Sequence, residues 1–208
     1  MAKQKSILVP VLLGILVSAT ILWSGMNPAF PKVWWAEIVP ILLIFIPLVV
    51  TYRWFRFSDA AYMFMACWLI LHSIGAHYTF ANVPFDWFGD LIGSERNHFD
   101  RFSHFSIGFY AYPVAEYLSR KGHCNPFLAG WFGLLTIMGV AAAYEIIEWW
   151  YAVIAGGEAG IEFLGSQGDI WDAQKDMLAD TLGAVFSLAL FFIYQPYRID
   201  STDKVSGN

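Results

Sequence analysis

Charged residues are scarce in this chain. Asp, Glu, Lys and Arg make up 14% of its 208 residues and hydrophobic residues 58%, whereas a soluble domain usually carries about 25% charged residues. No basic run suggests nucleic-acid binding. The two cysteines, Cys67 and Cys124, do not form the framework of a disulfide-rich secreted domain. The composition therefore argues against an ordinary soluble domain and favours a protein that lies in a membrane.

Six apolar segments reach or approach the roughly 20 residues that a membrane crossing needs. They lie at residues 7–24, 34–52, 60–80, 103–119, 127–153 and 177–195. We interpret the first as an uncleaved helix, because no clean small-x-small cleavage site follows it. The sequence thus predicts an all-α, polytopic membrane helix bundle with about six transmembrane helices in a single domain, residues 1–208. The longer connectors, about 81–100 and 154–172, are expected along the membrane interface.

Basic residues are divided unequally between alternate connectors. The four bases on one side are Lys32, Arg96, Arg101 and Lys175. The eight on the other side are Lys3, Lys5, Arg53, Arg56, Arg120, Lys121, Arg198 and Lys204. Because cytoplasmic loops carry the excess of Lys and Arg, both termini are predicted to be cytoplasmic.

Polar residues interrupt the fourth and fifth segments at helical spacing. Asp100 and His104 are four residues apart and Glu145 and Glu148 are three apart, so each pair shares a helix face. An acid within the bilayer costs several kcal/mol unless it is paired, hydrated, protonated or bound to a cation. Simpler roles remain open: a helix N-cap for Asp100, an interhelical hydrogen bond for His104 and an interfacial position for Glu148.

The sixth segment opens with a ladder of three acids, Asp172, Asp176 and Asp180, spaced four residues apart. Like charges at this spacing repel each other. Asp172 suits the positive end of the helix dipole and could simply be solvated there. Asp180 lies among apolar residues and has no such explanation. Intramembrane acids are usually functional, so Glu145, Asp176 and Asp180 are the strongest candidates.

Alternating topology places all of these residues in the outer half of the bilayer, where one pocket can hold them. Carboxylates and one imidazole favour a single divalent metal ion, Zn²⁺, Mn²⁺, Mg²⁺ or Ca²⁺. The predicted metal ligands are Asp100, His104, Asp172, Asp176 and Asp180. The predicted catalytic residues are Glu145, as general base or further ligand, and its partner Glu148. The predicted substrate-binding residues are Arg101, Lys175 and His77. His72 is interpreted as structural, and Glu116 as the partner of Arg120 four residues later.

Three segments carry a resemblance to a known family. They read FDRFSHF at residues 99–105, YEIIEW at 144–149 and LGSQGDIWDAQKDM at 164–177. With nearly the full length of the chain, they resemble the YjdF family of bacterial inner-membrane proteins of unknown function. This resemblance implies a multi-pass protein of the bacterial inner membrane.

The last three segments also resemble, more distantly, the VanZ-like membrane proteins, which are linked with envelope glycopeptide resistance. The chain departs from that family's pattern at Arg101, Glu148 and Asp180. It matches the pattern at Asp100, His104, Glu145, Asp176 and Gly183. The likeness supports the site without supplying a reaction.

Our leading hypothesis is a metal-dependent enzyme that acts at the outer leaflet on a membrane lipid or a lipid-linked envelope substrate. A cation or proton transporter is the first alternative. An accessory protein in which a bound ion staples helices together is the second. The sequence does not predict an oligomeric state.

Overall fold

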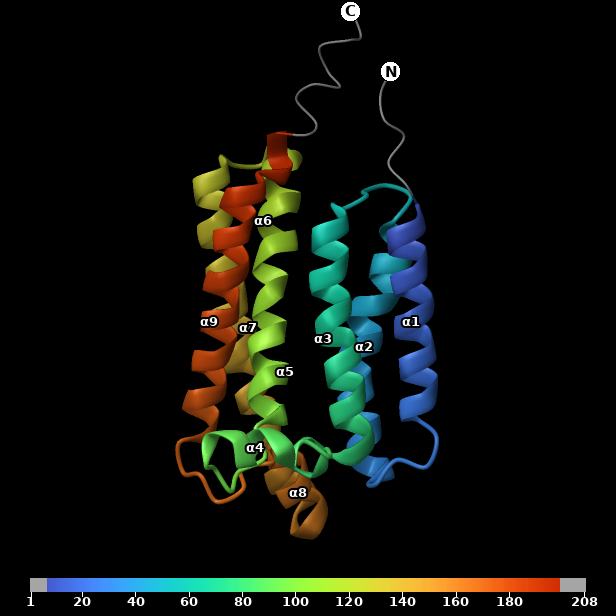
Figure 1. The fold of residues 1–208 in the computed structure, drawn as a ribbon, viewed down its shortest axis with the longest axis vertical. Helices are drawn as coiled ribbons and strands as arrows, with labels where there is room; N and C mark the ends of the chain where they lie inside the picture. The colour runs from blue at the N-terminus through green and yellow to red at the C-terminus, as the bar shows by residue number, and fades with distance from the viewer. Residues whose placement is uncertain (1–6, 199–208) are drawn as a thin grey trace, which may run out of the picture.

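The computed structural model describes residues 7–198, and every regular element in that range is helical (Figure 1). The predicted all-α class is confirmed. The α-helices are α1 (Leu8–Ser24), α2 (Pro31–Thr51), α3 (Asp59–Tyr78), α4 (Asp86–Ile92), α5 (Phe99–Ile107), α6 (Ala111–Arg120), α7 (Pro126–Ala155), α8 (Gly157–Leu164) and α9 (Asp172–Tyr194). Short 3-10 turns are η1 (Phe80–Asn82), η2 (Gly108–Tyr110) and η3 (Pro196–Arg198).

Four of the described helices, α2, α3, α7 and α9, are long and apolar enough to cross a membrane. Helix α1 is a shorter apolar helix of 17 residues that runs beside α3. Helices α5 and α6 follow one another along a single rod in Figure 1, in place of the fourth predicted segment. The short helices α4 and α8 lie in the two long connectors, at one end of the bundle. This arrangement is that of a polytopic membrane helix bundle.

The fourth predicted segment, 103–119, differs from expectation in its start and in its continuity. Helix α5 begins at Phe99, so Asp100 lies in its first turn, and η2 separates it from α6. Pro113 lacks the N–H that would bond the carbonyl of Phe109, and its ring crowds that carbonyl. The helix therefore tightens locally at η2. The sixth segment also begins earlier than predicted, at Asp172, which places the acidic ladder within α9.

Two glycines let α5 and α9 touch through their backbones. A Cβ on Gly183 would lie 2.8 Å from the carbonyl carbon of Phe105. A Cβ on Gly108 would lie 2.6 Å from the carbonyl carbon of Gly183. Real side chains do not approach so closely, hence both positions require glycine. This contact brings the polar residues of α5 next to those of α9.

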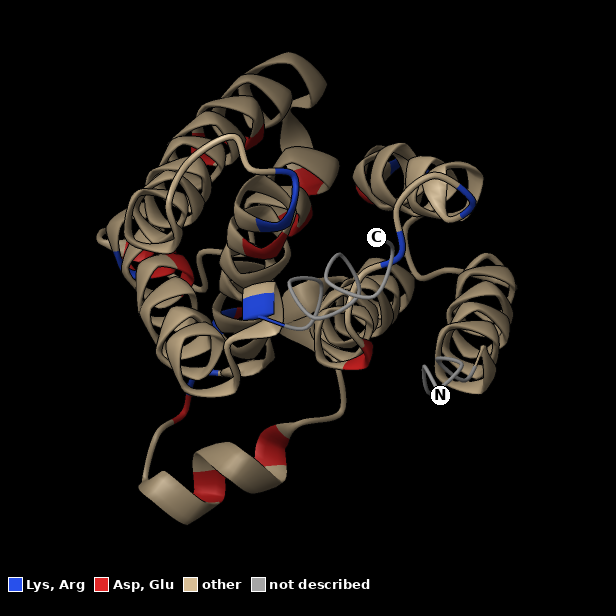
Figure 2. Ribbon diagram, turned by 90° about the horizontal axis from the view of Figure 1, so that it is seen from above, with Lys and Arg blue, Asp and Glu red and all other residues tan. Residues whose placement is uncertain are grey.

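The described chain starts and finishes at the same end of the bundle (Figure 1), as an even number of crossings requires. Seen from that end, Lys and Arg residues colour the nearest loops (Figure 2). Lys3, Lys5 and Lys204 lie outside the described residues. The cytoplasmic location of this basic end remains a prediction from the positive-inside rule.

Glu116 ties the helices together at the same end. Its side chain, 0% exposed, accepts hydrogen bonds from the backbone N–H and the hydroxyl of Ser58, both at 2.7 Å. Arg120 Nη1 lies 2.6 Å from Glu116 Oε1, which confirms the predicted pair. The carboxylate thus joins α6 to the start of α3, and these contacts give it a structural role.

Candidate functional site

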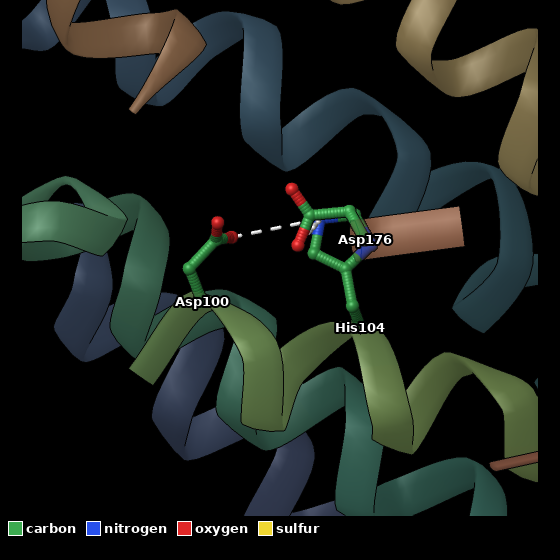
Figure 3. Close-up of side chains that lie close together, drawn as sticks. All are labelled: Asp100, His104 and Asp176. Atoms are coloured by element: carbon green, nitrogen blue, oxygen red, sulfur yellow. Dashed lines mark ion pairs between the residues drawn. The ribbon is translucent and has the colours of Figure 1, made fainter. Parts of the chain in front are cut away.

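A histidine and two aspartates converge from α5 and α9 (Figure 3). Asp100, His104 and Asp176 each offer one ligand atom, and these atoms all lie within 4.8 Å of one another. His104 Nε2 is 3.5 Å from Asp100 Oδ1 and 3.7 Å from Asp176 Oδ1. Both aspartates are buried. The helical spacing of Asp100 and His104, together with the close approach of α9, creates this cluster.

Asp180 orients the histidine from the other side. Its Oδ1 lies 3.1 Å from His104 Nδ1, and its side chain is almost fully buried. A proton on Nδ1 donates to this carboxylate, which leaves the lone pair of Nε2 facing Asp100 and Asp176. A histidine that ligates a metal is commonly held in this way by a carboxylate behind it.

Two arginines neutralise part of the acidic charge. The guanidinium of Arg101 contacts both Asp172 and Asp176. Arg96 Nη2 lies 2.6 Å from Asp172 Oδ1. Asp100 lies 3.7 Å from both arginines, whereas Asp180 contacts His104 and neither arginine. If all four aspartates are ionised, they outnumber the two arginines by two. A cluster of this kind attracts further positive charge.

Helix α7 adds the two predicted glutamates to the same region. Glu148 is buried and lines a cavity together with Asp100, His104 and Asp180. Glu145 interacts electrostatically with His104. Its Oε1 is buried and has no hydrogen-bond partner among the described residues. The structure therefore brings acids from α5, α7 and α9 together, as the sequence predicted.

Lys175 lies at the rim of the cluster. Its Nζ is 2.6 Å from Asp169 Oδ2, and 53% of its side chain is exposed. The hydrogen bond from Lys175 lowers the pKa of the Asp169 carboxyl. In the adjoining connector, partial burial and the charges of Arg96 and Arg101 lower the pKa of His98. The rim of the cluster therefore consists of paired basic and acidic side chains.

His77 does not join the cluster, contrary to the sequence prediction. Its Nδ1 lies 3.0 Å from the backbone carbonyl oxygen of Ser24. Its ring packs against Trp23 of α1, with centroids 4.4 Å apart. His77 lies on the side of α3 that faces α1. Because it follows His72 by five residues, the two histidines lie on different faces of the helix.

Sequence reasoning missed a second polar group, formed by Glu37, His72 and Tyr144. Glu37 is 1% exposed within α2. Its Oε2 accepts a hydrogen bond of 2.7 Å from the Tyr144 hydroxyl and lies 3.0 Å from His72 Nε2. His72 and Tyr144 line the same cavity as Asp100 and His104. The available signal was Glu37 itself, a single acid inside the apolar segment 34–52.

Apolar helices with a buried acidic centre near one end define this chain as an integral, polytopic membrane protein.

The family model described as predicted membrane protein (DUF2238) matches residues 9–196, and the chain belongs to this family. It is 30% identical over 184 residues to the inner membrane protein YjdF of Escherichia coli (strain K12), with 86% of this chain and 88% of the relative covered. The resemblance to the YjdF family and the inner-membrane location are confirmed. No solved structure matches the chain. The likeness to VanZ-like proteins stays a prediction.

Proposed function

We propose that the protein is a metal-dependent enzyme of the outer leaflet, whose divalent cation binds to Asp100, His104 and Asp176. One observation carries the proposal: three ligand atoms from two helices lie within 4.8 Å of one another in a buried place. Burying acids in a membrane without a positive partner is costly, and the two arginines nearby balance only part of the charge.

The spacing of the ligands suits a divalent ion. Two atoms that both bind Ca²⁺ at about 2.6 Å can lie up to about 5.2 Å apart. For Zn²⁺, with bonds of about 2.2 Å, the limit is about 4.4 Å. The spread of up to 4.8 Å means that the side chains would close slightly around any of these ions, and the imidazole favours Zn²⁺ or Mn²⁺ over Ca²⁺, which takes oxygen ligands. Asp172 and Asp180 would support the ligands, through Arg101 and His104 respectively.

The remaining groups fit a hydrolytic reaction. A divalent cation held by Asp100, His104 and Asp176 would supply an activated water as the nucleophile. Glu145, whose Oε1 lacks a hydrogen-bond partner among the described residues, would accept the proton of that water, with Glu148 beside it as partner. Arg101 and Lys175 would hold an anionic group of the substrate. The substrate class would be a membrane lipid or a lipid-linked envelope precursor, since the site lies between apolar helices.

Two features favour this function over the alternatives. A transporter needs a polar route to the opposite face, but a buried hydrophobic cluster that includes Ala111, Leu188 and Phe191 lies between the site and Glu116. An ion that only staples helices would have a closed shell of ligands. Here a cavity adjoins Asp100 and His104, and it leaves room for a reacting molecule.

Elemental analysis of the purified protein tests the proposal. We expect about one divalent ion per chain, and sharply less in Asp176→Asn or Asp100→Asn, because each variant loses a charged oxygen ligand. The matched control is Asp90→Asn, an exposed acid of α4 outside the cluster, which should keep the ion. Equal metal content in all four proteins would refute the metal site.

A further inference from the structure

A hollow lies between α2 and α6 in the basic half of the bundle, towards the end where the described chain starts and finishes (Figure 1). It has a volume of about 560 Å³. Pro47 of α2 and Pro113 of α6 line it from two sides, and Met65 of α3 is a further lining residue. Helix α2 packs on α3, whereas α6 packs on α7 and α9. The space that these helices leave between them is called the α2–α6 hollow below.

The α2–α6 hollow is apolar and has nearly the depth of one leaflet. Along α2 its lining residues run from Leu43 to Thr51, a length of about 12 Å at 1.5 Å per residue. The hydrocarbon region of one leaflet is about 15 Å deep. Leu43 is 69% exposed and Tyr117, on the α6 side, is 39% exposed, so the hollow is open to the bilayer. The hydrocarbon chain of a lipid fits its length and its polarity.

Two cations without an acidic partner lie at the membrane-surface end of the α2–α6 hollow. Lys121 is itself a lining residue, and its Nζ lies 5.4 Å from the centre of the Phe55 ring. The guanidinium of Arg53 lies 4.0 Å from the centre of the Trp54 ring, and both aromatic rings line the hollow. Within residues 7–198, no acidic side chain is at ion-pair distance from either cation. Both charges are therefore available to an anion.

The two described acids at this end of the bundle are engaged elsewhere. Glu116 is fully buried, where it binds Ser58 and Arg120. Asp59 lies 3.8 Å from Arg56. The surface end of the α2–α6 hollow thus carries positive charge, and its walls are apolar.

We propose that the α2–α6 hollow binds an anionic phospholipid of the cytoplasmic leaflet, the leaflet in which the positive-inside rule places the basic end. One acyl chain lies between α2 and α6, and the phosphate lies beside Arg53 and Lys121. Basic pockets between transmembrane helices on the cytoplasmic side recognise anionic head groups in this way. The inference is independent of the metal site, which lies towards the opposite end of the bundle.

Photo-crosslinking with lipid probes in vesicles tests the inference on the full-length protein. The probes are phosphatidylglycerol and phosphatidylcholine, each with a diazirine in one acyl chain, and mass spectrometry locates the labelled peptides. Phosphatidylglycerol should label residues 43–51 and 110–118 at least about fivefold more than phosphatidylcholine, because one basic side chain near an anionic lipid strengthens binding about fivefold. Both probes should label residues 185–193 of α9 equally, since these line none of the hollows described.

Two variants separate the head group from the hydrocarbon chain. The double variant Arg53→Gln, Lys121→Gln should abolish the preference for phosphatidylglycerol, whereas Lys32→Gln, at the opposite end of α2, should retain it. Val114→Trp fills the hollow, so labelling of residues 43–51 should fall for both probes. The matched control is Ala189→Trp, at an exposed position on α9 about as far from the end of its helix, and it should leave the labelling unchanged.

The outcomes also separate this inference from the proposed function. Equal labelling by the two probes in the wild-type protein would overturn the lipid site, and so would a preference that persists in the double variant. The variant Asp176→Asn, which is expected to lose the metal ion, should keep the full preference for phosphatidylglycerol. Failure of the metal site would therefore leave the lipid site intact, and the reverse also holds.

Discussion

Replacing Gly183 with alanine should disrupt the acidic centre without touching any of its side chains. The new Cβ would overlap the carbonyl oxygen of Phe105 and lie 2.8 Å from its carbonyl carbon. Restoring an ordinary C···O contact of about 3.3 Å takes a separation of α5 and α9 of about 1.5 Å. His104 and Asp180 lie beside this contact, 3.1 Å apart. Their hydrogen bond would therefore stretch beyond a useful length.

Overpacking of this kind costs about 1–3 kcal/mol, which for a chain of this size corresponds to a melting temperature lower by about 2–12 °C. Thermal unfolding of the purified protein in detergent measures the change, and elemental analysis measures the ion. The control is Gly139→Ala on α7, where a Cβ meets nothing within 4 Å and alanine favours the helix. If Gly183→Ala has the same melting temperature and the same metal content as Gly139→Ala, the backbone contact does not set the geometry of the site.

Three further predictions concern charged and polar contacts. Arg101→Gln leaves the buried carboxylate of Asp176 without its arginine and leaves Asp172 with Arg96 alone, so metal-free protein should lose about 3–5 kcal/mol of stability. Added Mn²⁺ should restore part of that stability in a melting assay. If Mn²⁺ has no effect, the ion and Arg101 do not neutralise the same aspartates. Tyr144→Phe removes the donor to Glu37 and should cost about 1–3 kcal/mol; an unchanged melting temperature would show that water replaces the hydroxyl. The bond from Lys175 lowers the pKa of Asp169, so it stabilises the fold above the unfolded pKa of about 3.9. This contribution disappears as the pH falls through the lower pKa of the folded state. In Lys175→Met, the melting temperature should therefore depend less on pH in that range.

Local spacing predicted the part of the site that one helix creates. Asp100 and His104 share a face because they are four residues apart, and the acidic ladder of α9 follows the same rule. The cost of charge in a bilayer singled out Glu145. Alternating topology then placed these helices' polar ends at one level, so the convergence followed from the sequence.

The other parts of the site depend on contacts between segments far apart in the sequence, and residue spacing does not predict such contacts. The bond between Glu37 and Tyr144 joins residues 107 positions apart, and it depends on how α2 leans over the cavity. His77 points to α1 because of the rotation of α3, a property of packing. The break at η2 has a local signal in Pro113, but the carbonyl groups of α9 make glycine necessary at position 108.

The close approach of α5 and α9 holds four members of the centre near one another before any ion arrives. Asp100, His104, Asp176 and Asp180 belong to two helices whose backbones touch at Gly108 and Gly183. Helix α7, which carries Glu145 and Glu148, packs on α9 and α6, so these acids are also held in place. An ion entering the centre would therefore find its ligands nearly in position, and little conformational entropy would be lost on ordering them.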